Sequence, residues 1–164
     1  DLIFEQTFFC ALPPAMRQKY VYQMHRLLSK NGTLAGLLFD RSFEVSPPFG
    51  GSRNEYEQLF QQTFVFKTIE IATQSVVKRQ NTELLFEFQK NNIVVNLYDF
   101  KGIDCNGCKK TITDLFFAIE GVKNVSMNVD FSEVLIVSEQ EIELQILRKL
   151  ISYNEKYKIN KVNK

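Results

Sequence analysis

Residues 93–162 carry an ordered series of hydrophobic patterns that constrains the fold more than any other feature of the chain. Apolar side chains alternate over 93–100, recur with helical spacing from 112 to Gly121, alternate over 125–136 around a turn, and return to helical spacing over 144–151. A last short strand is predicted at 157–159, and Ser138 with Glu141 predicts a capping box for the second helix. This β-α-β-β-α-β order predicts an α+β ferredoxin-like domain over residues 92–164.

Residues 1–91 follow a different order, which is strand, helix, strand, helix, strand, strand. The apolar run at 34–39 is typical of a strand buried on both faces of a parallel sheet. Ser52 with Glu55 predicts a capping box for the second helix, and 65–71 and 84–88 alternate like two antiparallel closing strands. The first helix is expected to bury residues at helical spacing, namely Tyr20, Met24, Leu27 and Leu28. The pattern predicts an α/β domain that precedes the ferredoxin-like one.

Composition excludes some classes of partner. The formal net charge is +1, so nothing in the charge favours nucleic acid or an anionic membrane as a partner. No apolar run approaches the roughly 20 residues that span a bilayer. Two of the three cysteines stand in one CxxC, which indicates thiols used for chemistry in a reducing, cytoplasmic setting.

The CxxC pair is the strongest candidate site. Cys105 and Cys108 lie between a predicted strand and a predicted helix, where backbone N–H groups, the helix dipole, Lys109 and Lys110 favour thiolates. Two soft sulfurs suit Zn(II) or Cu(I). A redox pair, a closed zinc site and two incidental cysteines are the alternatives. A closed zinc site needs two more ligands, and the only histidine, His25, lies in the other part of the chain.

Residues 93–162 resemble the heavy-metal-associated domain of copper chaperones and metal-transporting ATPases. The resemblance rests on three motifs at 102–108, 120–122 and 125–129. It implies a clamp that exchanges metal with a transfer partner protein through Cys105 and Cys108. The family's methionine two residues before the first cysteine is Ile103 here, which we expect to keep its packing role. Asp104 resembles variants associated with divalent ions, and its carboxylate is a harder ligand that favours a divalent ion; a solvated carboxylate or helix cap is the alternative.

Residues 1–90 resemble the C-terminal half of the thiopurine and thiol/halide S-methyltransferase family. The match runs through residues 1–13 and then Arg17, Tyr20, Met24, Leu27-Leu28, Pro47-Pro48-Phe49 and Tyr56. It implies a partial class I methyltransferase Rossmann-like sheet, S-adenosylmethionine as cofactor, and a small thiol, thiopurine or halide as acceptor. Residues 2–5 would be the fourth of seven strands, with ligands at the carboxyl end.

The same resemblance implies candidate site residues. Thr7 is the candidate cofactor contact, Arg17 can meet an anionic acceptor, and the acceptor pocket is expected to include aromatic residues, namely Phe8, Phe9, Phe49 and Tyr56. The loop at 47–51 would close over the acceptor. Phe8 and Phe9 can equally be core residues. Cys10 is expected to be a small buried hydrophobe, and His25 to lie on a solvated or interface face of its helix.

The function therefore has more than one interpretation. The chain contains no G-x-G motif, so we expect it to be the C-terminal part of a longer methyltransferase, without the main cofactor-binding half and with an unpaired strand edge. The first hypothesis is an S-methyltransferase with a metal-binding domain. The alternative is a non-enzymatic metal-binding protein or metallochaperone whose first half is a remnant or scaffold. An interaction module without metal is a third, weaker hypothesis.

Overall fold

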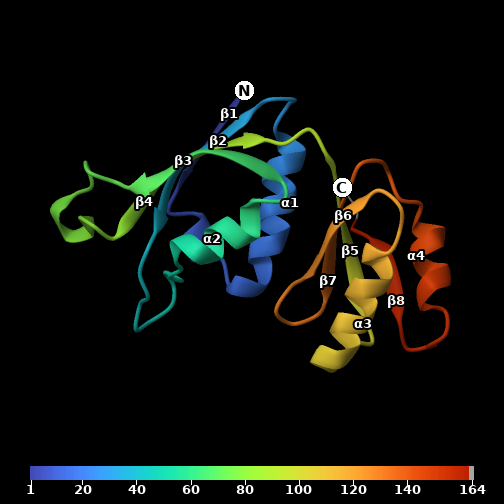
Figure 1. Cartoon of the computed structure of the whole chain (residues 1–164). Coiled ribbons are helices and arrows are strands. Elements are labelled where there is room, and N and C mark those ends of the chain that lie inside the picture. Colours follow the sequence, from blue (N-terminus) through green and yellow to red (C-terminus); the bar gives the residue numbers. More distant parts are fainter. Residues whose placement is uncertain (163–164) are drawn as a thin grey trace. The chain divides into compact units, whose positions relative to one another are not determined.

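The computed structural model describes residues 1–162 and divides the chain into two compact units between Asn92 and Ile93 (Figure 1). In the first unit, β1 (Leu2–Gln6) pairs in parallel with β2 (Thr33–Phe39), and β2 is followed across the sheet by two antiparallel strands, β4 (Glu83–Lys90) and β3 (Phe64–Ile71). The expected antiparallel pairing of the last two strands is confirmed. β1 forms one edge of this four-stranded sheet.

Two helices, α1 (Arg17–Leu27) and α2 (Arg53–Phe60), pack on one face of this sheet. Residues of the helices, of the sheet and of the short turn after β1 form one buried cluster, which includes Tyr20, Phe9, Tyr56, Phe60, Leu34, Leu38, Phe86 and Phe88. On the opposite face of the sheet, Leu2, Phe4 and Leu85 are exposed to solvent. The expectation that β2 is buried on both faces is therefore wrong within residues 1–92, because Thr33, Ala35 and Leu37 are only half-buried.

The first helix departs from the sequence pattern at its end. Leu27 is exposed because it lies off the buried face of α1, which includes Gln18, Val21 and His25, whereas Leu28, the C-cap, is buried. The prediction for His25 is also wrong, since its ring is buried. Its Nε2 lies 3.0 Å from the Asn91 carbonyl oxygen, and the ring packs edge-on against Phe64. Both contacts come from residues far along the chain.

The second unit contains β5 (Val94–Lys101), α3 (Asn106–Phe117), β6 (Val122–Met127), β7 (Glu133–Ser138), α4 (Leu144–Ile151) and β8 (Lys158–Lys161). Its strands lie in the order β6-β7-β5-β8, and all neighbours are antiparallel. Both helices pack on the face that carries the core, which includes Tyr98, Phe100, Ile112, Phe116, Ile136, Leu147 and Ile159. The predicted ferredoxin-like βαββαβ fold is confirmed.

One of the two predicted capping boxes is wrong. Ser52 Oγ accepts a hydrogen bond from the Glu55 amide at 3.3 Å, so the cap of α2 forms. Ser138, in contrast, is the buried last residue of β7 and donates its hydroxyl to the Gln140 carbonyl at 2.7 Å. The helix begins only at Leu144, with no side-chain cap. Serine occurs both at strand ends and at helix caps, so the sequence pattern alone did not show that Ser138 ends a strand.

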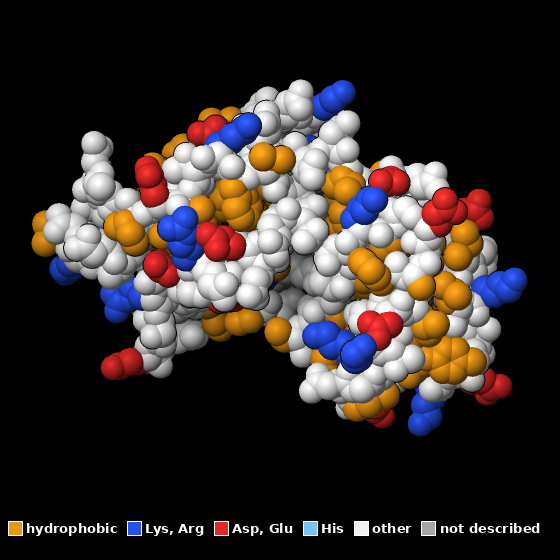
Figure 2. All heavy atoms as spheres, in the orientation of Figure 1, with side chains coloured by type: hydrophobic (Ala, Val, Ile, Leu, Met, Phe, Trp, Pro, Cys, Tyr) orange, Lys and Arg blue, Asp and Glu red, His pale blue; other side chains and the backbone are white. Residues whose placement is uncertain are grey.

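Two surface properties agree with the composition. On the face seen in Figure 2, acidic and basic side chains are interspersed among apolar ones. Within residues 1–162, no helix combines the length and the apolar character that crossing a membrane requires.

Candidate metal centre and methyltransferase-type residues

The two cysteines stand where β5 passes into α3. Cys105 is the N-cap of α3, with extended backbone dihedrals of φ −147° and ψ 154°. Its Sγ accepts a hydrogen bond from the Cys108 amide at 3.1 Å, and its carbonyl accepts one from the Lys109 amide at 3.0 Å. A sulfur in the N-cap position therefore receives an N–H group that the helix leaves without an internal partner. This environment stabilises negative charge on sulfur.

Asp104 and the two cysteines form a group of three side chains whose atoms are of the kind that can hold a metal ion. One ligand atom from each of Asp104, Cys105 and Cys108 lies within 4.8 Å of the others. Asp104 Oδ1 is 3.7 Å from the Cys108 sulfur. Asp104 and Cys105 are exposed and Cys108 is half-buried, so the group faces solvent. Two sulfurs and one carboxylate oxygen form an open ligand set rather than a closed four-ligand site.

The cysteine sulfurs themselves are in disulfide contact in this structure, with Cα atoms 5.3 Å apart. The expected pair of separate thiolates is thus not the form that the structure records. The thiolate is the form of cysteine that binds metal, so metal binding requires the reduced pair.

The two lysines that follow the cysteines make contacts on either side of the site. Lys110 Nζ forms an ion pair with Asp114 at 2.5 Å, so its charge is shared within the helix. Lys109 Nζ lies 5.5 Å from the centre of the Phe131 ring, in the turn between β6 and β7. Phe131 has a left-handed backbone conformation, with φ 62°. This cation–π contact links the first turn of α3 to that turn. The sequence pattern gave no signal for it.

The loop before Cys105 packs against the core of the second unit and against the loop before β8. Ile103 packs against the core of the second unit, as expected for the residue in the methionine position. Gly102 has φ +98°, and a side chain there would collide with the Lys156 carbonyl of the loop before β8. The Phe100 amide donates to the Ser132 carbonyl at 2.7 Å. The loop that carries the two cysteines is therefore fixed by β-strand and loop contacts on both sides.

In the first unit, the candidate cofactor contact Thr7 lies directly after β1. It is exposed, has φ 66°, and donates its hydroxyl to the Gln6 carbonyl at 2.6 Å. The turn is held by Glu5, a buried carboxylate that the sequence analysis did not single out. Glu5 Oε1 accepts from the Phe8 and Phe9 amides, both at 2.9 Å. Its Oε2 accepts from the Tyr20 hydroxyl at 2.6 Å.

Burial raises the pKa values of two titratable groups around this turn. Burial, followed by the hydrogen bond to Glu5, raises the pKa of the Tyr20 phenol. Burial and the negative charge of Glu5 also raise the pKa of the Cys10 thiol. That thiol is buried and donates to the Thr7 carbonyl at 3.1 Å. Cys10 is therefore the small buried residue that was predicted.

Three of the acceptor-pocket candidates meet in the core. The Arg17 guanidinium is buried and lies 5.1 Å from the centre of the Phe9 ring. It donates a hydrogen bond to the Gly50 carbonyl at 2.6 Å and forms an ion pair with Glu55. Phe9 packs edge-on against Tyr56 with ring centres 5.7 Å apart. The Tyr56 hydroxyl donates to the Phe39 carbonyl at 2.6 Å, and burial raises its pKa. These contacts give Phe9 and Tyr56 a packing role in the chain as described.

The other two candidates lie nearer the surface. Phe8 is exposed and its ring lies 6.1 Å from that of Tyr20. Phe49 is half-buried, and its amide donates to the Cys10 carbonyl at 2.6 Å. Together with the bond from Arg17 to Gly50, this contact anchors the loop at 47–51 to the segment after β1. A hollow of 540 Å³ opens beside that loop and is lined by Asp40, Arg41, Ser42, Phe43, Gly50, Gly51, Ser52 and Glu55.

The fold and the site define a class of protein: an α/β unit with a mixed sheet, followed by a ferredoxin-like unit that carries an exposed CxxC. Comparison with protein families agrees with both parts. Residues 1–96 match the thiopurine S-methyltransferase (TPMT) family, and residues 97–157 match the heavy-metal-associated domain. The chain belongs to the thiopurine S-methyltransferase family and carries a heavy-metal-associated domain after the methyltransferase segment.

Curated relatives match part of the chain. It is 42% identical over 62 residues to "Probable thiol methyltransferase 2" of Arabidopsis thaliana, which covers 36% of this chain and 26% of that protein. It is 31% identical over 94 residues to "Thiocyanate methyltransferase 1" of Brassica oleracea, covering 56% of this chain and 42% of the relative. The chain thus spans less than half the length of these relatives.

Solved structures resemble part of the chain weakly. A structure described as "Crosstalk between Cu(I) and Zn(II) homeostasis" has a TM-score of 0.37 and 19% identity, and covers 42% of this chain and 99% of its own. The yeast copper transporter domain CCC2A has the same TM-score with 16% identity, covering 42% of this chain and 94% of its own.

Proposed function

We propose that the chain combines the C-terminal part of an S-adenosylmethionine-dependent S-methyltransferase, residues 1–91, with a module that holds a soft metal ion, residues 92–164. The methyl acceptor is a small thiol, a thiopurine or a halide. Family membership supports the methyltransferase part, and the relatives' names refer to thiol and thiocyanate substrates. The metal module works in a reducing, cytoplasmic setting, because its cysteines bind metal only when reduced.

The observation that carries the metal assignment is the convergence of Asp104, Cys105 and Cys108 within 4.8 Å at the start of a helix. Reduced sulfurs there are soft ligands for Cu(I) or Zn(II), and the carboxylate adds a harder oxygen. The ligand set therefore favours Zn(II) over Cu(I). Its exposure and open coordination suit a site that passes the ion on to a partner protein.

A competition titration with a metal chelator tests the assignment on the reduced chain. The variant Cys105→Ser/Cys108→Ser is expected to lose high-affinity Zn(II) and Cu(I) binding, whereas the matched control Cys10→Ser keeps it, since Cys10 is buried in the other unit. The variant Asp104→Asn is expected to weaken Zn(II) more than Cu(I). Equal metal affinity in the double-serine variant and in the control contradicts the assignment.

For the methyltransferase part, S-adenosylmethionine would supply the methyl group. Of the described residues, Thr7 is the candidate cofactor contact, and its hydroxyl is bonded to its own chain at Gln6. This arrangement alone does not make a cofactor site. The chain's own contribution is structural: Glu5 shapes the turn after β1, and Arg17 holds the loop at 47–51.

A non-enzymatic metal-binding protein is the second candidate, because the exposed metal group lies in a unit with a core of its own. A methyl-transfer assay on the full-length protein separates the two. Transfer from S-adenosylmethionine to a small thiol, reduced in Arg17→Gln but kept in Cys105→Ser/Cys108→Ser, supports the enzyme. Metal binding without any transfer to thiol, thiopurine or halide supports the metallochaperone alternative.

A further inference from the structure

The loop between β5 and α3 suits two chemical states of its cysteine pair. The Cα atoms of Cys105 and Cys108 are 5.3 Å apart, inside the range of about 4.4–6.8 Å that a disulfide requires, and the two sulfurs are in disulfide contact. The third cysteine of the chain, Cys10, is buried in the first unit. The pair can therefore be oxidised without a rearrangement of the backbone, and only its reduced state offers the thiolates that bind metal.

The position of the pair is typical of a reactive disulfide rather than a structural one. The two residues are separated by 3 positions, and a disulfide across so short a loop restricts the unfolded chain less than one across a long loop. Cys105 is exposed, and exposed disulfides are the ones that other thiols reduce readily. The core of the second unit contains neither cysteine. The folded unit is thus compatible with both states.

Cys105 carries the sulfur that a reagent in solution meets first. It is exposed, whereas Cys108 is half-buried. The Cys108 amide donates to Cys105 Sγ at 3.1 Å, which stabilises a thiolate on Cys105. Gly107 leaves room beside that sulfur: apart from its two chain neighbours, a β-carbon there would approach no described side chain but Cys105, whose Sγ would be 3.9 Å away. Cys105 is therefore the attacking thiolate, and Cys108 is close enough to resolve the product.

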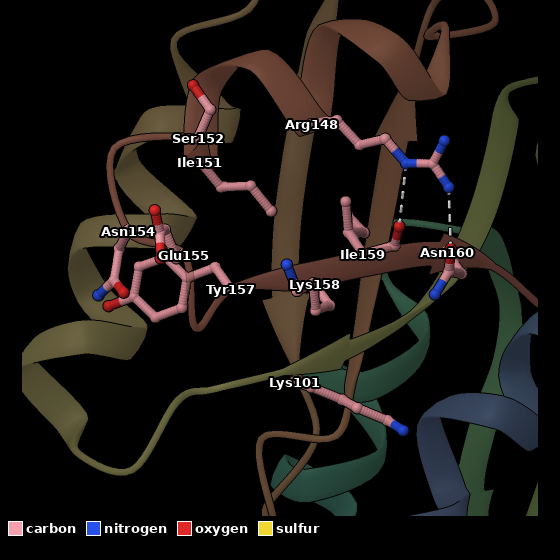
Figure 3. A pocket seen from close by; sticks show the side chains of 10 residues that line it. All are labelled: Lys101, Arg148, Ile151, Ser152, Asn154, Glu155, Tyr157, Lys158, Ile159 and Asn160. Atoms are coloured by element: carbon pink, nitrogen blue, oxygen red, sulfur yellow. Dashed lines mark hydrogen bonds between the residues drawn. The ribbon is translucent and has the colours of Figure 1, made fainter.

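A hollow of 840 Å³ in the same unit lies between the end of α4, the loop after it and β8 (Figure 3). Ten residues line it, and neither the cysteines nor Asp104 are among them. The pair thus meets its reagent at an exposed loop and not in this hollow. Such a position selects a reagent by its reactivity rather than by its shape, which favours a small soluble disulfide.

We propose that Cys105 and Cys108 exchange with a small disulfide of the glutathione class, and that this exchange expels a bound metal ion. The Cys105 thiolate attacks one sulfur of glutathione disulfide, whose S–S bond breaks and releases one glutathione thiolate with the bonding electron pair. The Cys108 thiolate then attacks the Cys105 sulfur, forms the protein disulfide and releases the second glutathione thiolate. Two electrons pass from the protein sulfurs to glutathione, each released thiolate takes up a proton, and the metal ion leaves with its charge unchanged.

Equilibration of the chain in mixtures of reduced and oxidised glutathione tests the exchange, with free thiols alkylated and the products read by mass spectrometry. The natural chain and the matched control Cys10→Ser should form the Cys105–Cys108 disulfide as the oxidised share rises. Cys108→Ser should instead accumulate a mixed disulfide of glutathione with Cys105, because the second step is lost. A natural chain that stays reduced in glutathione disulfide, or that accumulates the mixed disulfide as Cys108→Ser does, overturns the proposal.

Zn(II) distinguishes this proposal from the proposed metal site, on which only the release of metal rests. At free Zn(II) of about 100 times its Kd, the apparent equilibrium constant for oxidation should fall about 100-fold, because the ion binds only the reduced pair. Glutathione disulfide should transfer the ion to a chromogenic chelator that binds Zn(II) more weakly than the reduced chain, and reduced glutathione should not. Disulfide formation that Zn(II) does not suppress supports the exchange and contradicts the metal site. Zn(II) binding without disulfide formation overturns the exchange alone.

Discussion

The turn that places Thr7 depends on one buried carboxylate, Glu5, and replacing it should be costly. In Glu5→Ala, the Phe9 amide and the Tyr20 hydroxyl both lose their acceptor in a buried environment. A buried donor left without a partner costs about 1–3 kcal/mol, so the two together cost about 2–6 kcal/mol. Removing a buried charge offsets part of this loss. We therefore expect the first unit to lose about 3 kcal/mol of unfolding free energy.

Glu5→Gln keeps the shape and one carbonyl oxygen, and should cost less than half as much as Glu5→Ala. Urea unfolding followed through NMR signals of residues 1–92 measures both variants, and amide exchange at Phe9 reports on the turn directly. Glu44→Ala is the matched control, since Glu44 is exposed, and its effect should stay within about 0.5 kcal/mol. If Glu5→Ala changes stability no more than Glu44→Ala does, the carboxylate does not hold the turn.

Three further predictions concern other parts of the chain. Burial, with positive Lys90 nearby, lowers the pKa of His25, so the folded unit binds fewer protons than the unfolded chain, and its stability should fall as the pH drops through the unfolded value of about 6.5. The single histidine resonance should titrate below that value, and a midpoint above it refutes the buried site. Gly102→Ala should destabilise the second unit by about 1–3 kcal/mol, measured by urea unfolding, because its φ is positive and the new methyl group would meet the Lys156 carbonyl. Phe116→Ala should lower the unfolding free energy of the second unit alone by about 3–5 kcal/mol, since the ring is fully buried there. An equal loss of unfolding free energy in the first unit would contradict separate cores.

Local patterns predicted most of the fold, and nonlocal contacts explain the rest. Alternating and helical spacing located every strand and both helices of the second unit, because each buries one face in one core. The burial of His25 was missed because Phe64 and Asn91, which cover it, are far along the chain. Leu27 is exposed because the buried face of α1 includes Gln18, Val21 and His25, and polar residues on that face hid it from a pattern of apolar spacing.

The candidate sites differ in how much the sequence revealed. Cys105, Cys108 and Asp104 are neighbours along the chain, so their convergence followed from spacing at a helix start. The supports of that loop are distant residues, such as Phe131 under Lys109, and had no local signature. Arg17 was expected near an anionic acceptor, but the structure pairs its guanidinium with Glu55 and Gly50. Its role toward an acceptor stays a prediction.

X-ray absorption of the reduced, Zn(II)-loaded chain tests the central claim most directly, because it counts the sulfur atoms bound to the ion. The metal site predicts two sulfur neighbours at about 2.3 Å together with lighter oxygen or nitrogen neighbours at about 2.0–2.2 Å. In Cys105→Ser/Cys108→Ser, the sulfur signal should disappear, whereas Cys10→Ser should keep it. A spectrum with no sulfur neighbour in the natural chain, or an unchanged sulfur count in the double-serine variant, would contradict metal binding by Cys105 and Cys108.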